Sequence, residues 1–233
     1  MKRQMPPNTE SILGHAVCDE LPFEQNASPR PLHTRIPALI LFWLLAPTSV
    51  VIGAILMVGH WYTLPVPVID DPYLVRALAD LRPPAHRNSW MAVHVLYAQC
   101  RCSLRIFEHL FETSRPREIH EQILLVGAHP EFERHAHERG FAVHVLTPSD
   151  LKRTYRIESA PLLLVLDPSN RIRYAGGYTD RKQGAAIRDL EIISQLAAEG
   201  STETLPLFGC GVSKELQEFL DPIGIKYDRT SEN

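Results

Sequence analysis

The chain has 233 residues, of which 45% are hydrophobic and 22% charged, and its formal net charge is −3. This length allows one or two domains, and the apolar content is sufficient for a packed core. The weak negative charge provides no basic surface for nucleic acid. Four cysteines are too few for a scaffold held together by disulfides.

The first predicted element is a membrane-spanning helix over residues 36–59, which carry no charged side chain. At about 1.5 Å per residue, this run suffices to cross a hydrocarbon core of about 30 Å. It is also longer than the apolar part of a signal peptide, which predicts an uncleaved anchor. Residues 1–35 show no helical or strand period and are predicted to be a disordered tail, in which Cys18 has no expected role.

The basic residues that flank this run indicate its orientation. Those on its N-terminal side are Lys2, Arg3, Arg30 and Arg35. On the other side, residues 60–79 contain Arg76 as their one basic residue. The positive-inside rule therefore predicts a single-pass protein of the cell inner membrane, with a cytoplasmic N-terminus and a periplasmic C-terminal domain. The lipid bilayer is accordingly an expected partner.

Residues 60–88 are predicted to be a linker with a short helix at 72–82, and residues 89–200 alternate strand and helix patterns. Strands are predicted at 91–96, 122–128, 141–146, 162–167 and 171–177, and helices at 103–111, 130–139, 150–156 (capped by Ser149) and 183–198. This alternation predicts an α/β fold with helices on both faces of a mostly parallel sheet. Residues 201–233 form a C-terminal extension with a helix at 213–220.

Two cysteines, Cys100 and Cys102, lie where the first strand ends and the first helix begins. A helix N-terminus offers unpaired N–H groups and a partial positive charge, both of which favour a thiolate. Arg101 adds a neighbouring cation that is expected to stabilise it. A disulfide between two cysteines separated by one residue closes a ring tighter than that of C-x-x-C, so it is expected to be easily reduced.

This turn resembles the active site of the thioredoxin family. Residues 95–103 are similar to the family's active-site turn, with C-x-C in place of C-x-x-C, and residues 156–165 resemble its cis-proline loop. The resemblance covers residues 89–200 and implies a thioredoxin-like fold, with a mixed central sheet flanked by helices. It also implies that Pro161 is cis and faces the cysteine turn, where the family binds substrate polypeptide.

A narrower resemblance is to membrane-anchored thioredoxin-like proteins of the RedB type, relatives of the ResA and TlpA thiol reductases. The matching runs are residues 100–103, 176–179 and 208–210. Two departures are that no Trp precedes Cys100 and that Arg101 replaces the expected proline. These departures leave the reduction potential and the substrate open.

Cys210 is the third cysteine on the C-terminal side of the apolar run, between Gly209 and Gly211. It is a candidate auxiliary thiol that resolves a mixed disulfide, a third metal ligand or a small buried core residue. Residues 200–210 have no regular period, so the sequence leaves open whether Cys210 lies near the cysteine turn.

Three functions are compatible with these residues. The main hypothesis is a thiol–disulfide oxidoreductase without cofactor that acts on a disulfide-bearing client protein. Cys100 is its expected nucleophile because of its outer position at the turn, Cys102 resolves the mixed disulfide, and the resemblance implies that Pro161 aligns the client. The alternatives are a Cu(I) metallochaperone or respiratory-complex assembly factor with Cys100, Cys102 and Cys210 as ligands, and a non-catalytic thioredoxin-like scaffold.

The histidines are interpreted more simply. His135 and His137 point to different faces of a helix, so the cluster that they form with His129 is predicted to be solvated surface. His94 on the first strand is predicted to be a hydrogen-bonded core or surface residue rather than a proton relay.

Overall fold

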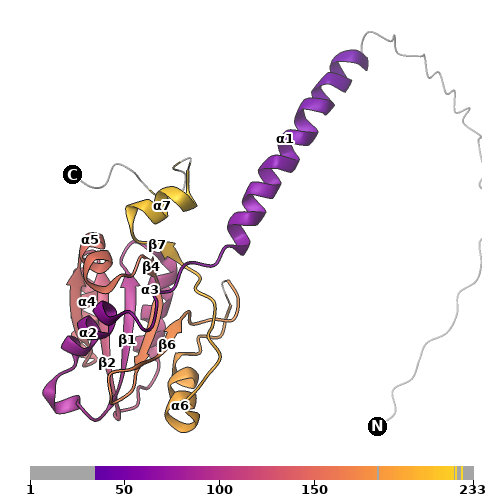
Figure 1. Cartoon of the computed structure of the whole chain (residues 1–233). Coiled ribbons are helices and arrows are strands. Elements are labelled where there is room, and N and C mark those ends of the chain that lie inside the picture. Colours follow the sequence, from indigo (N-terminus) through magenta and orange to yellow (C-terminus); the bar gives the residue numbers. More distant parts are fainter. Residues whose placement is uncertain (1–34, 183, 223, 225–226, 228–233) are drawn as a thin grey trace, which may run out of the picture. The chain divides into compact units, whose positions relative to one another are not determined.

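The structure is a computed structural model that describes residues 35–182, 184–222, 224 and 227 (Figure 1). The predicted tail up to residue 34, Cys18 included, lies outside the described residues. The elements are α1 (Arg35–Trp61), α2 (Pro72–Leu81), η2 (Pro84–His86), β1 (Trp90–Tyr97), α3 (Arg101–Glu112), β2 (Ile119–Val126), α4 (Pro130–Glu138), β3 (Ala142–Leu146), α5 (Pro148–Asp150), η3 (Leu151–Tyr155), β4 (Ser159–Ala160), β5 (Leu162–Leu166), β6 (Ile172–Gly176), α6 (Asp189–Glu199), β7 (Cys210–Gly211) and α7 (Lys214–Leu220).

The chain divides into two compact units, residues 1–51 and 52–233. Helix α1 covers the predicted apolar run and contains Pro47. Its exposed large apolar side chains include Leu39, Phe42, Trp43, Val50 and Met57. No helix in the described part of the chain is long and apolar enough to cross a membrane. The predicted helix is therefore present, whereas its crossing of a membrane is not confirmed.

Five strands form the central sheet, in the order β3-β2-β1-β5-β6. β1 pairs in parallel with β2, which pairs in parallel with β3, whereas β5 is antiparallel to both β1 and β6. The expected mixed sheet is confirmed, and the element order, with a closing β5–β6 hairpin followed by α6, is thioredoxin-like. The sheet has equal numbers of parallel and antiparallel pairings, which corrects the prediction of a mostly parallel sheet.

Side chains alternate between the two faces of β1, and each face is buried in its own core. Helix α2 and the η3 turn cover the face of Val93 and Val95 and form the first core with it. Helices α3, α4 and α6 cover the face of Ala92 and Leu96 and form the second core with it. Residues 60–88 were predicted to be a linker, but α2 is part of the first core, since Leu74 and Leu78 are fully buried there. Residues of the predicted extension are also buried, namely Leu205, Leu207 and Val212.

Two helices begin at residues other than those predicted from the sequence. Thr147, not Ser149, caps α5, because its hydroxyl accepts the Asp150 N–H at 3.1 Å and Pro148 fits the first helical position. Helix α6 was expected from residue 183 and begins at Asp189. Before it, Arg105 donates to the Gly184 and Ala185 carbonyls, which holds this segment in a turn.

A network of charged side chains lies inside the second core and joins β1, β2, α3 and α6. Arg115 contacts Glu121 and Asp189, each at 2.7 Å, and both carboxylates are almost completely buried. His109 bonds Asp189 at 2.8 Å, and His94 bonds both Glu121 and the Tyr178 hydroxyl. His94 is thus a hydrogen-bonded core residue, as predicted, and it faces away from the core that contains Cys100.

Candidate thiol site

The cysteine turn is formed where β1 passes into α3. Cys100 is the N-cap residue of α3, and its N–H donates to the Tyr97 carbonyl at 2.9 Å. The Ser103 hydroxyl accepts the Tyr97 N–H at 3.0 Å, which closes the turn from the helix side. The Cys100 side chain therefore lies beside the first, unpaired N–H groups of the helix, where a thiolate is favoured.

The proline loop lies next to this turn, as the resemblance implied. The peptide bond between Ala160 and Pro161 is cis. Cys100 Sγ lies 4.0 Å from the Ala160 carbonyl oxygen, and both Ala160 and Pro161 are buried.

The structure brings Cys210 to the same place. β7 pairs antiparallel with β4 (Figure 1). In this pairing, Cys210 is opposite Ala160. Cys210 Sγ lies 2.6 Å from Cys100 Sγ, although 110 positions separate the two residues in the sequence. The question that the sequence left open is thereby answered: Cys210 belongs to the cysteine site.

Cys210 lies in a segment that we call the strap, residues 205–212. Backbone hydrogen bonds tie the strap along its length. The Leu205 carbonyl accepts the Gly177 N–H at 3.0 Å, the Leu207 carbonyl accepts the Leu64 N–H at 2.8 Å, and the Val212 N–H donates to the Glu158 carbonyl at 2.7 Å. Cys210 is therefore held in place by an ordered segment of backbone.

Two glycines let the strap approach the domain closely. A Cβ on Gly209 would overlap the Ala160 carbonyl oxygen and lie 2.6 Å from Pro161 Cδ. A Cβ on Gly177 would overlap the Pro206 carbonyl oxygen. The strap can lie where it does only because these positions have no side chain.

The three described cysteines differ in exposure. Cys100 is 1% exposed, Cys210 is half-buried and Cys102 is exposed. The prediction that Cys100 has the outer position at the turn is wrong, because the strap and the proline loop cover it, whereas Cys102 points outward from the first turn of α3.

The pKa of the Cys100 thiol is lowered from 9.0 to about 3. Hydrogen bonds from the Cys102 and Cys210 side chains contribute most, burial opposes them, and the backbone N–H groups of Ser103 and Cys102 lower the pKa further. The lowered pKa favours the thiolate form of Cys100 at neutral pH. Arg101, the predicted stabilising cation, is exposed and is not among the groups that lower this pKa.

No group of three or more His, Cys, Asp or Glu side chains in the described part of the chain is arranged to hold a metal ion. His135 and His137 are exposed, as expected for surface residues, whereas His129 caps α4 through its ring nitrogen, which accepts the Phe132 N–H.

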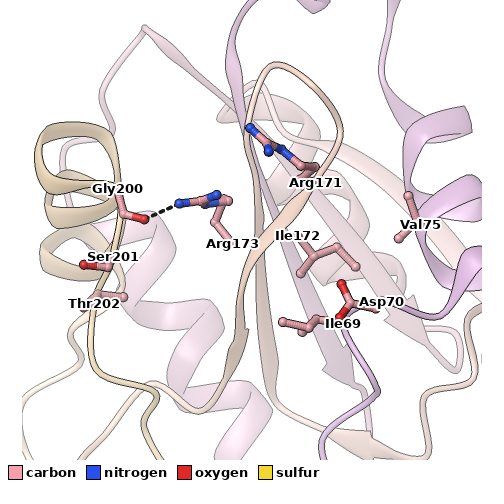
Figure 2. A pocket seen from close by; sticks show the side chains of 9 residues that line it. All are labelled: Ile69, Asp70, Val75, Arg171, Ile172, Arg173, Gly200, Ser201 and Thr202. Carbon is pink, nitrogen blue, oxygen red and sulfur yellow. Dashed lines mark hydrogen bonds between the residues drawn. The ribbon is translucent and has the colours of Figure 1, made fainter.

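Nine residues line a surface hollow of about 440 Å³ (Figure 2). Its lining includes Arg171, Ile172 and Arg173, and Arg173 donates to the Gly200 carbonyl at 2.5 Å. Ile172 pairs with Leu166, which in turn pairs with Met91 near the start of β1. The hollow is thus at the end of the sheet opposite to Cys100, and no cysteine lines it.

The residues that sequence reasoning missed are those that place Cys210. Ala160 pairs with it, and Gly209 and Gly177 make room for the strap. One signal was present in the sequence, because a cysteine between two glycines indicates a close backbone approach at a reactive group.

No family model and no curated protein matches this chain. Among solved structures, a hypothetical protein from Sinorhizobium meliloti 1021 is 19% identical over 64% of this chain and 91% of its own, with a TM-score of 0.45. The thioredoxin domain of a thiol-disulfide oxidoreductase from Bacteroides vulgatus is 14% identical over 38% of this chain and 69% of its own, with a TM-score of 0.30. A thiol:disulfide interchange protein from Bacteroides sp. is 17% identical over 39% of this chain and 66% of its own, with a TM-score of 0.31. These likenesses are too distant to carry an argument about activity.

Proposed function

We propose that this protein is a thiol–disulfide oxidoreductase that acts on disulfides of client proteins. One observation carries the proposal: the buried Cys100 thiol has its pKa lowered to about 3 and lies 2.6 Å from a second thiol, that of Cys210. A thiolate is the species that attacks disulfides, and a neighbouring thiol is needed to release the client from the mixed disulfide.

The exchange transfers two electrons from the protein to the client. One thiolate of the site attacks a client sulfur, the client's disulfide breaks, and its second sulfur leaves as a thiolate that takes up a proton. Another thiolate of the site then attacks the mixed disulfide and releases the client's first sulfur. The protein is left with one internal disulfide, which an external dithiol must reduce before the next turnover.

We also propose that α1 anchors the chain in a membrane, with the thiol site on the outer side. The support is the uncharged run of residues 36–59, the helix that contains it and the exposure of its apolar side chains.

A charge near the helix centre costs about 2.5–3.5 kcal/mol in lipid. Val50→Arg is therefore expected to move the full chain out of carbonate-washed membranes. Val68→Arg, at a similarly exposed position outside α1, is not. Recovery of the unaltered chain in the soluble fraction would refute the anchor.

The redox proposal is tested on the full chain in detergent, with metal removed and Cys18→Ser to simplify thiol counting. In a series of glutathione redox buffers, two thiols are expected to titrate together at a cellular potential. Cys100→Ser is expected to abolish both this transition and the reduction of insulin, because it removes the thiolate that both require.

Two results would contradict the proposal. In one, the thiols never form a reversible disulfide and insulin is not reduced. In the other, the chain retains one Cu(I) per molecule and does not exchange disulfides, which would favour the metallochaperone hypothesis. If function in cells survives both Cys100→Ser and Cys102→Ser, the scaffold hypothesis would hold instead.

A further inference from the structure

We infer that the three cysteines form a relay in which the exposed Cys102 exchanges with the client, Cys100 is the central sulfur, and Cys210 on the strap completes the stored disulfide. The inference rests on the proposed oxidoreductase function and assigns a step to each thiol. It predicts that the stable oxidised pair is Cys100–Cys210, not the pair of the C-x-C motif.

The solvent exposure of the thiols indicates that Cys102 is the one that attacks the client disulfide. A client disulfide must reach the attacking sulfur in line with the bond that breaks, and Cys100 is only 1% exposed. The strap and the Ala160 carbonyl lie against Cys100 Sγ. Cys102 is exposed in the first turn of α3, and its side chain hydrogen-bonds Cys100. It is the thiol that can contact both a client and the central sulfur.

The positions of the sulfur atoms indicate that the stable disulfide of the oxidised protein joins Cys100 and Cys210. The β4–β7 pairing and the hydrogen bond of Val212 to Glu158 already hold Cys210 Sγ 2.6 Å from Cys100 Sγ. A Cys100–Cys102 disulfide would instead close a small ring through a single intervening residue, between the N-cap and the first turn of α3. That ring is the more strained of the two, so exchange toward Cys210 is favoured.

Each step of the relay is a thiol–disulfide exchange, so atoms and electrons balance with the protein and the client as the only reactants. The Cys102 thiolate attacks the client disulfide, which forms a Cys102–client bond and releases one client thiolate. The Cys100 thiolate attacks Cys102 Sγ, which forms the Cys100–Cys102 disulfide and releases the second client thiolate. The Cys210 thiolate then attacks Cys100 Sγ, which forms Cys100–Cys210 and returns Cys102 as a thiolate. The client gains two electrons, and the last step moves a disulfide within the protein.

The first experiment requires no change at these cysteines. The reduced full chain, carrying Cys18→Ser, is oxidised with insulin, alkylated and digested, and its disulfides are mapped by mass spectrometry. We expect the Cys100 and Cys210 peptides to be joined and Cys102 to be alkylated. A Cys100–Cys102 disulfide with alkylated Cys210 would overturn the relay and leave the proposed oxidoreductase function intact.

Two matched variants test the order of steps. In Cys100→Ser, the mixed disulfide with insulin is expected to persist on Cys102, because the sulfur that resolves it is missing. In Cys102→Ser, the mixed disulfide is expected to be lost although Cys100 is present. A mixed disulfide on Cys100 in Cys102→Ser would overturn the assignment of Cys102. If the unaltered chain neither reduces insulin nor becomes oxidised, the proposed function itself fails, and the relay fails with it.

Discussion

Replacement of Arg115 by methionine is expected to lower the free energy of unfolding by about 3–5 kcal/mol, as is usual when one partner of a buried ion pair is removed. Arg115 is the one cation that contacts both Glu121 and Asp189 among the described ion pairs, and both carboxylates are nearly inaccessible to water. Methionine keeps much of the volume but leaves two buried charges without their cation. Urea denaturation at pH 7 measures the loss. Arg117→Met is the matched control, because Arg117 is exposed, and its effect is expected to stay within about 0.5 kcal/mol.

The same network predicts how stability depends on pH. Burial raises the pKa of Asp189, but the hydrogen bond from His109 and the charge of Arg115 outweigh it and lower the pKa to about 2. A depressed folded pKa stabilises the protein above the unfolded value, near 3.8, and this stabilisation is lost as the pH falls toward 2. The unaltered protein should therefore lose stability between about pH 4 and pH 2, and Arg115→Met should lose less over that interval. Equal slopes for the two proteins would show that Arg115 does not hold Asp189 ionised.

Local patterns were sufficient for the elements around the cysteine turn. The apolar run at 91–96 and the helical spacing at 103–111 correspond to β1 and α3 within a few residues, and the N-cap position of Cys100 follows from where they meet. Such patterns depend on residues close together in the sequence, which is why they are visible without a structure.

Packing between distant segments was not visible in the same way. The helix at 72–82 was predicted, but its place in the core was not, because Leu74 and Leu78 become buried against residues of η3, Leu151 and Tyr155, far along the chain. The charged network likewise depends on contacts between segments that are far apart in the sequence. Arg115 lies in the loop between α3 and β2, Glu121 on β2 and Asp189 on α6, and no local pattern indicates that the three meet.

The position of Cys210 depends on two features that leave little trace in a sequence. β7 is only two residues long, which is too short to show a period, and the strap before it is irregular. The contact with Cys100 is determined by close approaches of glycine backbone at Gly209 and Gly177. The sequence could indicate a thiol of interest between two glycines, but not the surface on which that segment lies.

The close approach of Gly209 leads to a further prediction, that Gly209→Ala uncouples Cys210 from Cys100 without changing any cysteine. The added methyl group would overlap the Ala160 carbonyl and crowd Pro161, so the strap must move away from β4. Overpacking of this kind costs about 1–3 kcal/mol. We expect the oxidised variant to lose the Cys100–Cys210 disulfide. We also expect the pKa of Cys100 to rise, because the hydrogen bond from Cys210 is one of the groups that lower it.

Hydrogen exchange separates this effect from general unfolding. The Leu64 and Gly177 amides donate to strap carbonyls, and the Val212 amide donates from the strap, so all three should exchange faster in Gly209→Ala. Amides that pair β1 with β2 should keep their protection if the domain remains folded. Gly53→Ala is the control, because a Cβ there meets nothing within 4 Å in the described structure. If Gly209→Ala still forms the Cys100–Cys210 disulfide at the rate of the unaltered chain, the tight packing of the strap is not what holds the two thiols together.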